Sequence, residues 1–297
     1  MKKRWILNVI MLALVASLVS FLYLRPKQTI EEMPIYEVSQ LKLVDINSVK
    51  VEFPAKSPVI FEKIENYWLM KAPYKQRADQ LSVQRILSVI AAKSEHRFPA
   101  TDLAKYGLEN PLVKVTISNN SGQEVFTYGG YNTVTDEQYL AYKDGVYLLT
   151  AAYSEAASTQ AIEMVDKNIL SPAEAKQIAG FDFSHLEQWE ETSLNVDIEN
   201  GQWKTNVAEA KPTQNDLNEW QEFSWKQNPA KSVEAYTPDR NASYPYLMLK
   251  LSNGKKVRIN KMMESPEMIL ARPDEGLTYH FNNDVGFSML NPPLNIK

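Results

Sequence analysis

Residues 63–71, KIENYWLMK, return later in the chain as residues 197–205, DIENGQWKT. In both stretches a short polar turn joins a strand-like segment to a second segment that contains a tryptophan. The two tryptophans, Trp68 and Trp203, are 135 residues apart. This repetition predicts that one folding unit occurs twice.

The spacing is maintained along the rest of the two stretches. Pro111 and Pro245, each of which precedes a pair of strands, are 134 residues apart, and the hairpin glycines Gly145 and Gly276 are 131 residues apart. Between these landmarks each stretch contains alternating, strand-like segments and one main amphipathic helix. The sequence therefore predicts an α+β fold with two tandem repeats of a mostly antiparallel sheet and one main helix.

The N-terminus predicts a membrane anchor. Trp5–Leu24 contains no charged residue, and as a helix its twenty residues would span about 30 Å, the hydrocarbon thickness of a bilayer. Lys2, Lys3 and Arg4 precede it, which predicts a cytoplasmic N-terminus. A cleaved signal peptide is the alternative, but Phe21–Leu24 is bulky where a cleavage site needs small residues. We expect a single-pass protein of the bacterial inner membrane with a periplasmic C-terminal domain.

These features divide the chain into five parts. We expect a cytoplasmic stub and transmembrane anchor at 1–27, a tether at 28–43, a first α+β repeat at 44–150, a helical linker at 151–180 and a second α+β repeat at 181–297. A stop in the linker is expected near Ser171-Pro172.

Composition excludes several classes of function. Without residues 1–27 the chain contains 27 Lys and Arg against 36 Asp and Glu, a net charge of −9. Nucleic acids bind proteins mainly through positively charged side chains, so we expect no nucleic-acid partner. The chain has no cysteine, which excludes disulfides, thiolate nucleophiles and thiolate metal sites.

Local signals mark the helices of the first repeat. Asp79 is the expected N-cap of a helix that ends near His96, with an apolar stripe at Val83, Ile86, Leu87 and Ile90. A short helical turn is expected from Thr101, its N-cap, to Gly107, where a left-handed residue ends it in a Schellman motif.

The main helix of the second repeat begins with a different signal. Thr213 and Asp216 resemble a capping box, and Asn228-Pro229 ends the helix. Leu217, Trp220 and Phe223 form the expected buried stripe. Trp225 lies about 140° away from Trp220 on an α-helix, so it is a candidate partner contact, with packing on its own sheet as the alternative. Tyr131 in the first repeat is a second candidate contact, with cross-strand packing as its alternative.

A group of motifs in the first repeat resembles a known family. The motifs are Trp68–Pro73, Ala78-Asp79, Tyr106–Pro111, Gly129-Gly130 and Tyr139. Together they are similar to a bacterial family of membrane-anchored domains of unknown function, over about 44–180. The resemblance implies an association with auxiliary components of ABC-type transport systems linked to gliding motility. It implies no catalytic or ligand-binding residue, and the second repeat lacks the Tyr-Gly-Leu segment.

No catalytic motif is present in the sequence. His96, His185 and His280 are far apart and form no local pair of metal ligands. Neither a nucleophile elbow nor a phosphate-binding P-loop occurs, and Gly129-Gly130 is expected to be a turn at the exit of a strand. We predict no catalytic residue, no metal and no cofactor.

The paired carboxylates do not change this prediction. They occur at Asp136-Glu137, Glu190-Glu191 and Asp274-Glu275. Neighbours on a strand point to opposite faces, so such pairs do not form an acid–base couple, and Asp274-Glu275 is expected to belong to a turn before Gly276.

The sequence favours a protein that is not an enzyme. The expected function is a membrane-anchored periplasmic accessory or scaffold subunit of an envelope complex, such as an ABC-type transport system, with other envelope proteins as partners. Two alternatives stay open. One is a module that binds envelope glycan or peptide in a groove between the repeats, and the other is an uncharacterised hydrolase.

Overall fold

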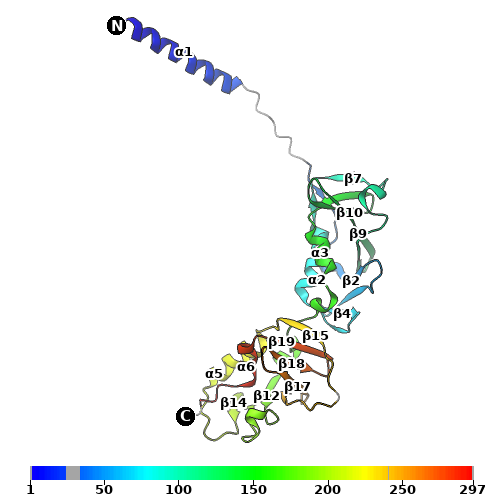
Figure 1. Cartoon of the computed structure of the whole chain (residues 1–297), viewed down its shortest axis with the longest axis vertical. Coiled ribbons are helices and arrows are strands. Elements are labelled where there is room, and N and C mark those ends of the chain that lie inside the picture. The colour runs from blue at the N-terminus through cyan, green and yellow to red at the C-terminus, as the bar shows by residue number, and fades with distance from the viewer. Residues whose placement is uncertain (1, 25–33, 240, 296–297) are drawn as a thin grey trace. The chain divides into compact units, whose positions relative to one another are not determined.

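The computed structural model describes residues 2–24, 34–239 and 241–295. The chain divides into two units, Met1–Ile35 and Tyr36–Lys297. The first unit contains helix α1 (Lys2–Leu24) (Figure 1). Among the residues whose side chains are described, no helix is both long enough and apolar enough to cross a membrane. The expected transmembrane helix is therefore not confirmed.

The second unit begins with a nine-stranded antiparallel sheet. Its strands follow the order β5 (Gln76–Arg77), β4 (Tyr67–Ala72), β3 (Val59–Ile64), β2 (Ile46–Glu52), β8 (Val113–Asn119), β9 (Gly122–Asn132), β10 (Glu137–Tyr142), β11 (Gly145–Leu149), β7 (Arg97–Pro99). Helices α2 (Gln80–Leu87) and α3 (Ala152–Ser158) lie beside each other against this sheet (Figure 1). A separate short pair joins β1 (Tyr36–Glu37) to β6 (Lys93–Ser94).

An eight-stranded antiparallel sheet follows. Its order is β14 (Gln202–Thr205), β13 (Asn195–Glu199), β12 (Ile178–Asp182), β16 (Tyr246–Leu251), β17 (Lys256–Met263), β18 (Met268–Arg272), β19 (Leu277–Phe281), β15 (Ser232–Ala235). Its helices are α5 (Gln214–Trp220), the π-helix η6 (Gln221–Lys226) and α6 (Asn283–Leu290). The predicted class, mixed α and β with mostly antiparallel sheets and few helices, is confirmed.

The two sheets have the same strand order except at one edge. Position by position, β4, β3, β2, β8, β9, β10, β11 and β7 of the first sheet correspond to β14, β13, β12, β16, β17, β18, β19 and β15 of the second. The first sheet has β5 as an additional edge strand.

Each sheet also holds its main helix by the same contact. The backbone N–H of Trp68 donates to Gln80 Oε1 at 2.9 Å, and Gln80 Nε2 donates to the Trp68 carbonyl at 3.1 Å. In the second sheet Gln214 makes the same two bonds with the backbone of Trp203, at 2.7 and 2.8 Å. A glutamine side chain thus binds both backbone groups of one strand tryptophan in each sheet.

The predicted caps at Asp79 and Thr213 and the predicted end of the corner at Gly107 are confirmed. The Asp79 side chain accepts from the backbone of Leu81, and Thr213 and Asp216 form a reciprocal capping box. Gly107 has a φ of 68° and ends η3 (Ala104–Tyr106), and Leu108 N–H donates to the Leu103 carbonyl at 3.0 Å, as in a Schellman motif.

The end of the first main helix and the start of the corner were predicted wrongly. α2 ends at Leu87, a 3-10 helix η2 (Ser88–Ala91) follows, and β6 begins at Lys93, so His96 does not close a helix. The reason is tertiary, because Lys93-Ser94 pairs with β1 and this pairing overrides local helix propensity. Thr101 is not an N-cap, since η3 starts only at Ala104.

The segment predicted as linker also differs from the expectation. Ser171 begins helix α4 (Pro172–Lys176) with a capping box, where a stop was expected, because proline is well tolerated in the first helical turn. β12 then begins at Ile178, inside the predicted linker. The sequence did not predict this strand, because glycine is uncommon inside strands. Glycine is needed at position 180, since a Cβ atom there would collide with the Asp197 carboxylate.

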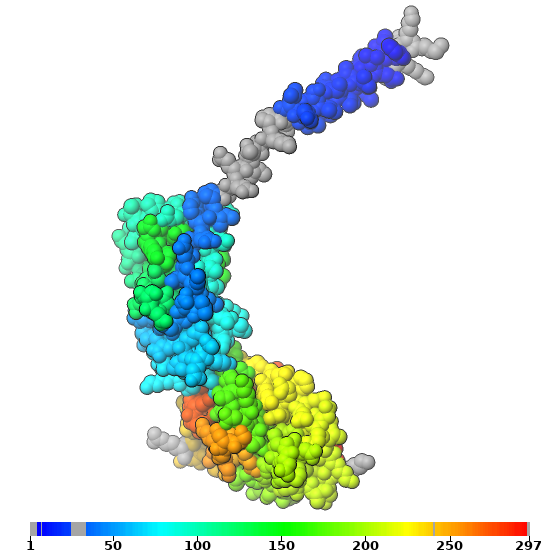
Figure 2. Space-filling view, turned by 180° about the vertical axis from the view of Figure 1, so that it is seen from behind, coloured from blue at the N-terminus to red at the C-terminus, as the bar shows by residue number. Residues whose placement is uncertain are grey.

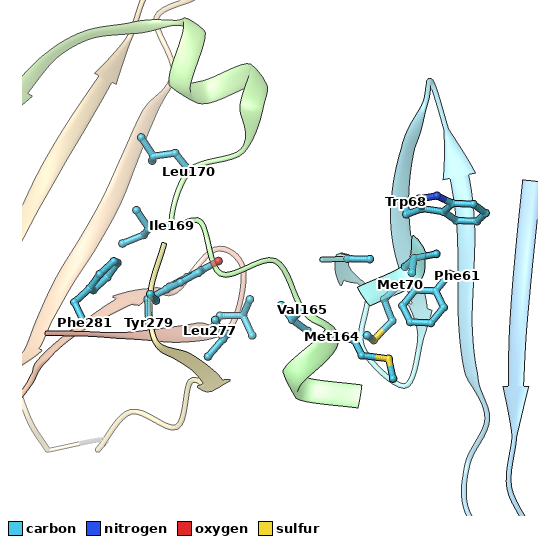
Figure 3. Close-up of a cluster of buried hydrophobic side chains, with 14 of the residues drawn as sticks. Phe61, Trp68, Met70, Met164, Val165, Ile169, Leu170, Leu277, Tyr279 and Phe281 are labelled. Carbon is cyan, nitrogen blue, oxygen red and sulfur yellow. The ribbon is translucent and has the colours of Figure 1, made fainter. Parts of the chain in front are cut away.

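Buried side chains of the connecting segment between α3 and β12 join the two sheets. Met164 and Val165 lie beside β4, while Ile169 and Leu170 lie beside β19 (Figure 3). All four are at most 3% exposed. The connecting segment is thus part of the hydrophobic core rather than a free linker.

Candidate functional site

Trp225, the first predicted contact residue, is buried. It is 3% exposed, and its ring centroid lies 5.0 Å from that of Phe181 and 6.4 Å from that of Trp220. The prediction assumed 3.6 residues per turn, but residues 221–226 form a π-helix, in which hydrogen bonds connect residues five apart. Residues 220 and 225 therefore share one face, and of the two alternatives for Trp225 the structure shows packing on its own sheet.

The same change of pitch exposes Phe223, which was expected in the core. Its side chain is 55% exposed. On the neighbouring helix α6, Phe287 is 56% exposed. Two contacts hold the helices together: Trp220 Nε1 donates to the Ser288 carbonyl at 2.7 Å, and the Ser224 and Ser288 hydroxyl oxygens are 2.7 Å apart. We call the exposed side chains of α5, η6 and α6, which include Phe223 and Phe287, the helix-pair surface.

The helix-pair surface contains a groove and is acidic. The groove has a volume of about 460 Å³, and Trp220, Phe223, Ser288 and Pro293 are among the residues that line it. The charged residues of α5, η6 and α6 are four acids and one base: Asp216, Glu219, Glu222, Asp284 and Lys226. Figure 2 shows the segment of α5 and η6, in yellow-green and yellow, at the surface of the molecule.

Tyr131, the second predicted contact residue, is half exposed. It lies in β9 of the first sheet, opposite Gln138 of β10. Val134, in the turn that joins these strands, is 90% exposed. Tyr131 therefore lies in the first sheet and Trp225 in the helix that packs on the second, and the structure does not bring the two predicted residues together.

The histidines lie in three separate environments. His96 stacks on Phe98 with 6.3 Å between ring centroids, and His185 stacks on Tyr246 at 4.3 Å. His280 is 9% exposed, and its Nδ1 is 2.9 Å from Glu267 Oε1. Within the described part of the chain no three His, Asp or Glu residues are placed to hold a metal ion.

Gly129 and Gly130 have a packing role. They lie inside β9 and not at a strand exit, so that prediction is wrong. A Cβ atom on Gly129 would collide with the Tyr106 carbonyl, and one on Gly107 would lie 2.8 Å from the Gly130 nitrogen. The strand and the Tyr106–Leu108 corner approach so closely that only glycine fits.

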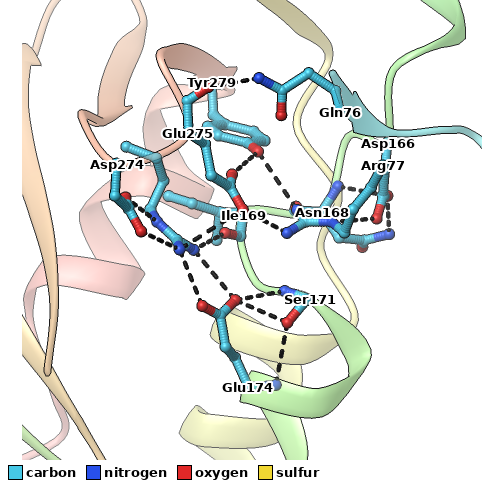
Figure 4. A network of polar contacts seen from close by, with 11 residues as sticks. Gln76, Arg77, Asp166, Asn168, Ile169, Ser171, Glu174, Asp274, Glu275 and Tyr279 are labelled. Atoms are coloured by element: carbon cyan, nitrogen blue, oxygen red, sulfur yellow. Dashed lines mark hydrogen bonds and ion pairs between the residues drawn. The ribbon is translucent and has the colours of Figure 1, made fainter. Parts of the chain in front are cut away.

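Charged side chains connect the two sheets beside the buried apolar contacts (Figure 4). Arg77, from edge strand β5, pairs with Glu275 of the second sheet at 2.6 Å and with Asp166 of the connecting segment at 3.1 Å. Its Nη2 also donates to the Asn168 carbonyl at 2.6 Å. Burial opposes the charge of Arg77, but Glu275, Tyr279 and Asp166 together raise its pKa.

A second arginine lies deeper in this junction. Arg272 is 1% exposed and pairs with Glu174 at 3.0 Å and Asp274 at 2.9 Å. It also donates to the Ile169 carbonyl at 2.7 Å. Burial raises the pKa of both carboxyl groups, but hydrogen bonds from Arg272 outweigh it and leave each pKa below its ordinary value.

The junction does not have the properties of a catalytic site. Carboxyl groups with lowered pKa are poor proton donors near neutral pH, and their partners are arginines, which do not titrate. Burial and Glu275 raise the pKa of Tyr279, whose hydroxyl donates to Glu275 at 2.6 Å. Asp274 and Glu275 do precede the Gly276 turn as predicted, but their arginine partners were not recognised, because one is about two hundred residues away.

Comparison with known proteins gives one match. A family model described as Domain of unknown function (DUF4340) matches residues 68–264, roughly two thirds of the chain. The match begins in β4 and ends just after β17, so it continues well beyond residue 180, where the resemblance seen in the sequence ended. No curated protein and no solved structure matches the chain.

Proposed function

The chain belongs to the family described as Domain of unknown function (DUF4340), and we propose that it is a membrane-anchored periplasmic subunit that binds another protein of the cell envelope and is not an enzyme. The observation on which this proposal rests is the helix-pair surface. Phe223 and Phe287 are more than half exposed on two helices that hydrogen bonds fix to each other. Exposed aromatic side chains on rigid elements are typical of protein–protein contacts.

The charge of this surface indicates the kind of partner. Four carboxylates against one lysine on α5, η6 and α6 favour a segment that presents lysine or arginine around apolar residues. Nucleic acid is not such a partner, because its phosphates would be repelled.

The proposed location rests on the sequence of the N-terminus. Trp5–Leu24 contains no charged residue, and Lys2, Lys3 and Arg4 precede it. A reporter enzyme that is active only in the periplasm, fused after Lys297, should be active. Activity of a cytoplasmic reporter at the same position would contradict the proposed orientation.

We also propose that the two sheets arose as tandem repeats of one unit. The shared strand order and the paired contacts of Gln80 with Trp68 and Gln214 with Trp203 support this proposal. A duplicated unit of this kind suits a scaffold, because one copy can keep the fold while the other acquires a binding surface.

An ABC-type transport system is the complex we propose. The support is the resemblance of the first-repeat motifs to a family found with such systems. The groove between the repeats is not proposed as a ligand site, because apolar side chains and paired charges occupy the junction (Figures 3 and 4).

Pull-down of the full chain from detergent-solubilised membranes tests the proposal. The parent chain should retain a reproducible protein partner, and the double variant Phe223→Ser with Phe287→Ser should lose it. Leu81→Ser is a matched control, since Leu81 is 61% exposed on α2 of the other sheet. A parent chain that is a lone monomer would refute the proposal. If the Leu81→Ser control lost the partner to the same extent, the helix-pair surface would not be the binding surface.

A further inference from the structure

The second sheet contains a pocket whose lining side chains have hydrogen-bond donors without acceptors among the described residues. It has a volume of about 390 Å³, within the range of small-ligand sites, and lies between the segment after β15 and strand β17. Tyr236, Tyr244, Arg258 and Asn260 line it, with Pro273 from the turn after β18. Neither the helix-pair surface nor the junction uses these side chains.

Arg258 is held in place through its nitrogen Nε and through its flat face. Nε donates to Asn260 Oδ1 at 2.8 Å, and the guanidinium lies 3.8 Å from the centre of the Tyr246 ring. Tyr246 is in turn stacked on His185 at 4.3 Å. Among the described residues no carboxylate pairs with Arg258, so its two terminal nitrogens are available as a donor fork.

The tyrosines of the pocket add two more donors. Tyr236 accepts from Asn260 Nδ2 at 3.2 Å, and Tyr244 accepts from the backbone of Asp239 at 3.1 Å. Each hydroxyl is therefore used as an acceptor, and neither proton has an acceptor in the described part of the chain. Asn260 is only 4% exposed, so the position of Tyr236 is fixed by a buried side chain.

Asp239 limits the charge of the ligand. It lines the same pocket, and its Oδ1 accepts from the backbone of Asn241 at 2.9 Å. A ligand with two negative charges would be repelled there, whereas a hydroxyl group could donate to this carboxylate.

The geometry points to a binding site for a hydroxylated monocarboxylate, that is, an acidic monosaccharide or the acidic end of a glycan. The carboxylate of the ligand would accept hydrogen bonds from both terminal nitrogens of Arg258. The hydroxyl groups of the ligand would bind Asp239 and the two tyrosines. The rings of Tyr236 and Tyr244, which line the pocket, would supply the apolar contact that a sugar ring needs. This site extends the proposed function, because it gives the periplasmic domain a ligand in addition to a protein partner.

Calorimetric titration of the full chain in detergent with glucuronate, glucose and acetate tests the inference. Glucuronate should bind at least about tenfold more tightly than glucose, which lacks the carboxylate, and than acetate, which lacks the hydroxyls. Equal binding of glucuronate and acetate would reduce the site to a simple anion site, and no binding of glucuronate would overturn it.

Three variants connect binding to these residues. Arg258→Lys keeps the charge but loses the fork, and should weaken glucuronate binding about tenfold or more. Tyr236→Phe should weaken it less. Arg85→Lys, at an exposed position on α2, should leave it unchanged. Unchanged binding by Arg258→Lys would refute the site, and this outcome is independent of the pull-down that tests the protein partner.

Discussion

Helices α2 and α5 begin in the same way and end differently. Each starts behind a side-chain cap, Asp79 or Thr213, and each uses its first residue, Gln80 or Gln214, to bind the backbone of a strand tryptophan. After two turns α2 tightens into the 3-10 helix η2, whereas α5 widens into the π-helix η6.

This difference decides which residues reach the surface. The tightened end buries Val89 and Ile90, at 0% and 6% exposed. The widened end buries Trp220 and Trp225 but exposes Phe223. The same start signal is therefore followed by a buried end in the first helix and by an exposed aromatic side chain in the second, and the two ends differ in helix pitch.

The largest effect is expected where the two sheets are most alike. Trp68 and Trp203 are both 5% exposed at equivalent strand positions. Trp68→Ala and Trp203→Ala should each lower the free energy of unfolding by about 3–5 kcal/mol, because each leaves a large cavity. The melting temperature should fall by roughly 6–20 °C. If only one variant were destabilised, the equivalence of the two positions would be wrong.

The charged junction connects the two sheets through Arg77 and Arg272. Arg272→Met should cost about 3 kcal/mol, because Glu174 and Asp274 would remain buried or half-buried without their cation. Arg77→Met should cost less, since Arg77 is more exposed, at 15% against 1%. Urea denaturation of the two variants measures the difference, and the reverse order would show that Arg77 is the main support of the junction.

Acid titration separates the ion pairs from simple packing. The folded-state pKa values of Glu174 and Asp274 lie below their ordinary values of 4.5 and 3.8. The stability that these groups contribute is therefore fully present above about pH 4.5 and is lost as the pH falls through the lower folded values. In urea denaturation from pH 6 to pH 3, the midpoint of the parent chain should fall with pH. The midpoint of Arg272→Met should fall less over the same range.

A smaller effect is expected at the two glutamines. Gln214→Ala leaves both the N–H and the carbonyl of Trp203 without the partner that Gln214 supplies, at a cost of about 1–3 kcal/mol. Gln80→Ala leaves the N–H of Trp68 without its partner, but the Trp68 carbonyl still accepts from the backbone N–H of Ala78 at 3.2 Å. Gln80→Ala should therefore cause the smaller loss of the two, and equal losses in urea denaturation would contradict this difference. A Gln→Glu exchange is the control, since it keeps the acceptor but not the donor.

Local signals predicted the parts of this fold that depend on neighbouring residues. The caps at Asp79 and Thr213 and the left-handed turn at Gly107 are set by side-chain and backbone contacts within a few residues. The end of α2 depends instead on the pairing of Lys93 with β1, and a sequence pattern does not contain that contact.

The structure buries Trp225 and exposes Phe223 in the same helical segment. Trp225 was chosen because an α-helix of 3.6 residues per turn would place it outside the stripe. The contacts that stabilise the wider pitch involve Ser224 and Ser288, which are 64 residues apart, so they were invisible locally. The Arg258 pocket was missed for a similar reason, since it combines β17 with the loop after β15.

The smallest effect on stability is expected at Phe223. Phe223→Ala should change the free energy of unfolding by less than about 0.5 kcal/mol, because the side chain is 55% exposed on η6. Val134→Ala, at a 90% exposed position in the first sheet, is the matched control. A regular α-helix at residues 221–226 would turn Phe223 toward the core, and its truncation would then cost about 3–5 kcal/mol. Urea denaturation of Phe223→Ala therefore tests whether residues 221–226 have the wider pitch that distinguishes this helix from α2.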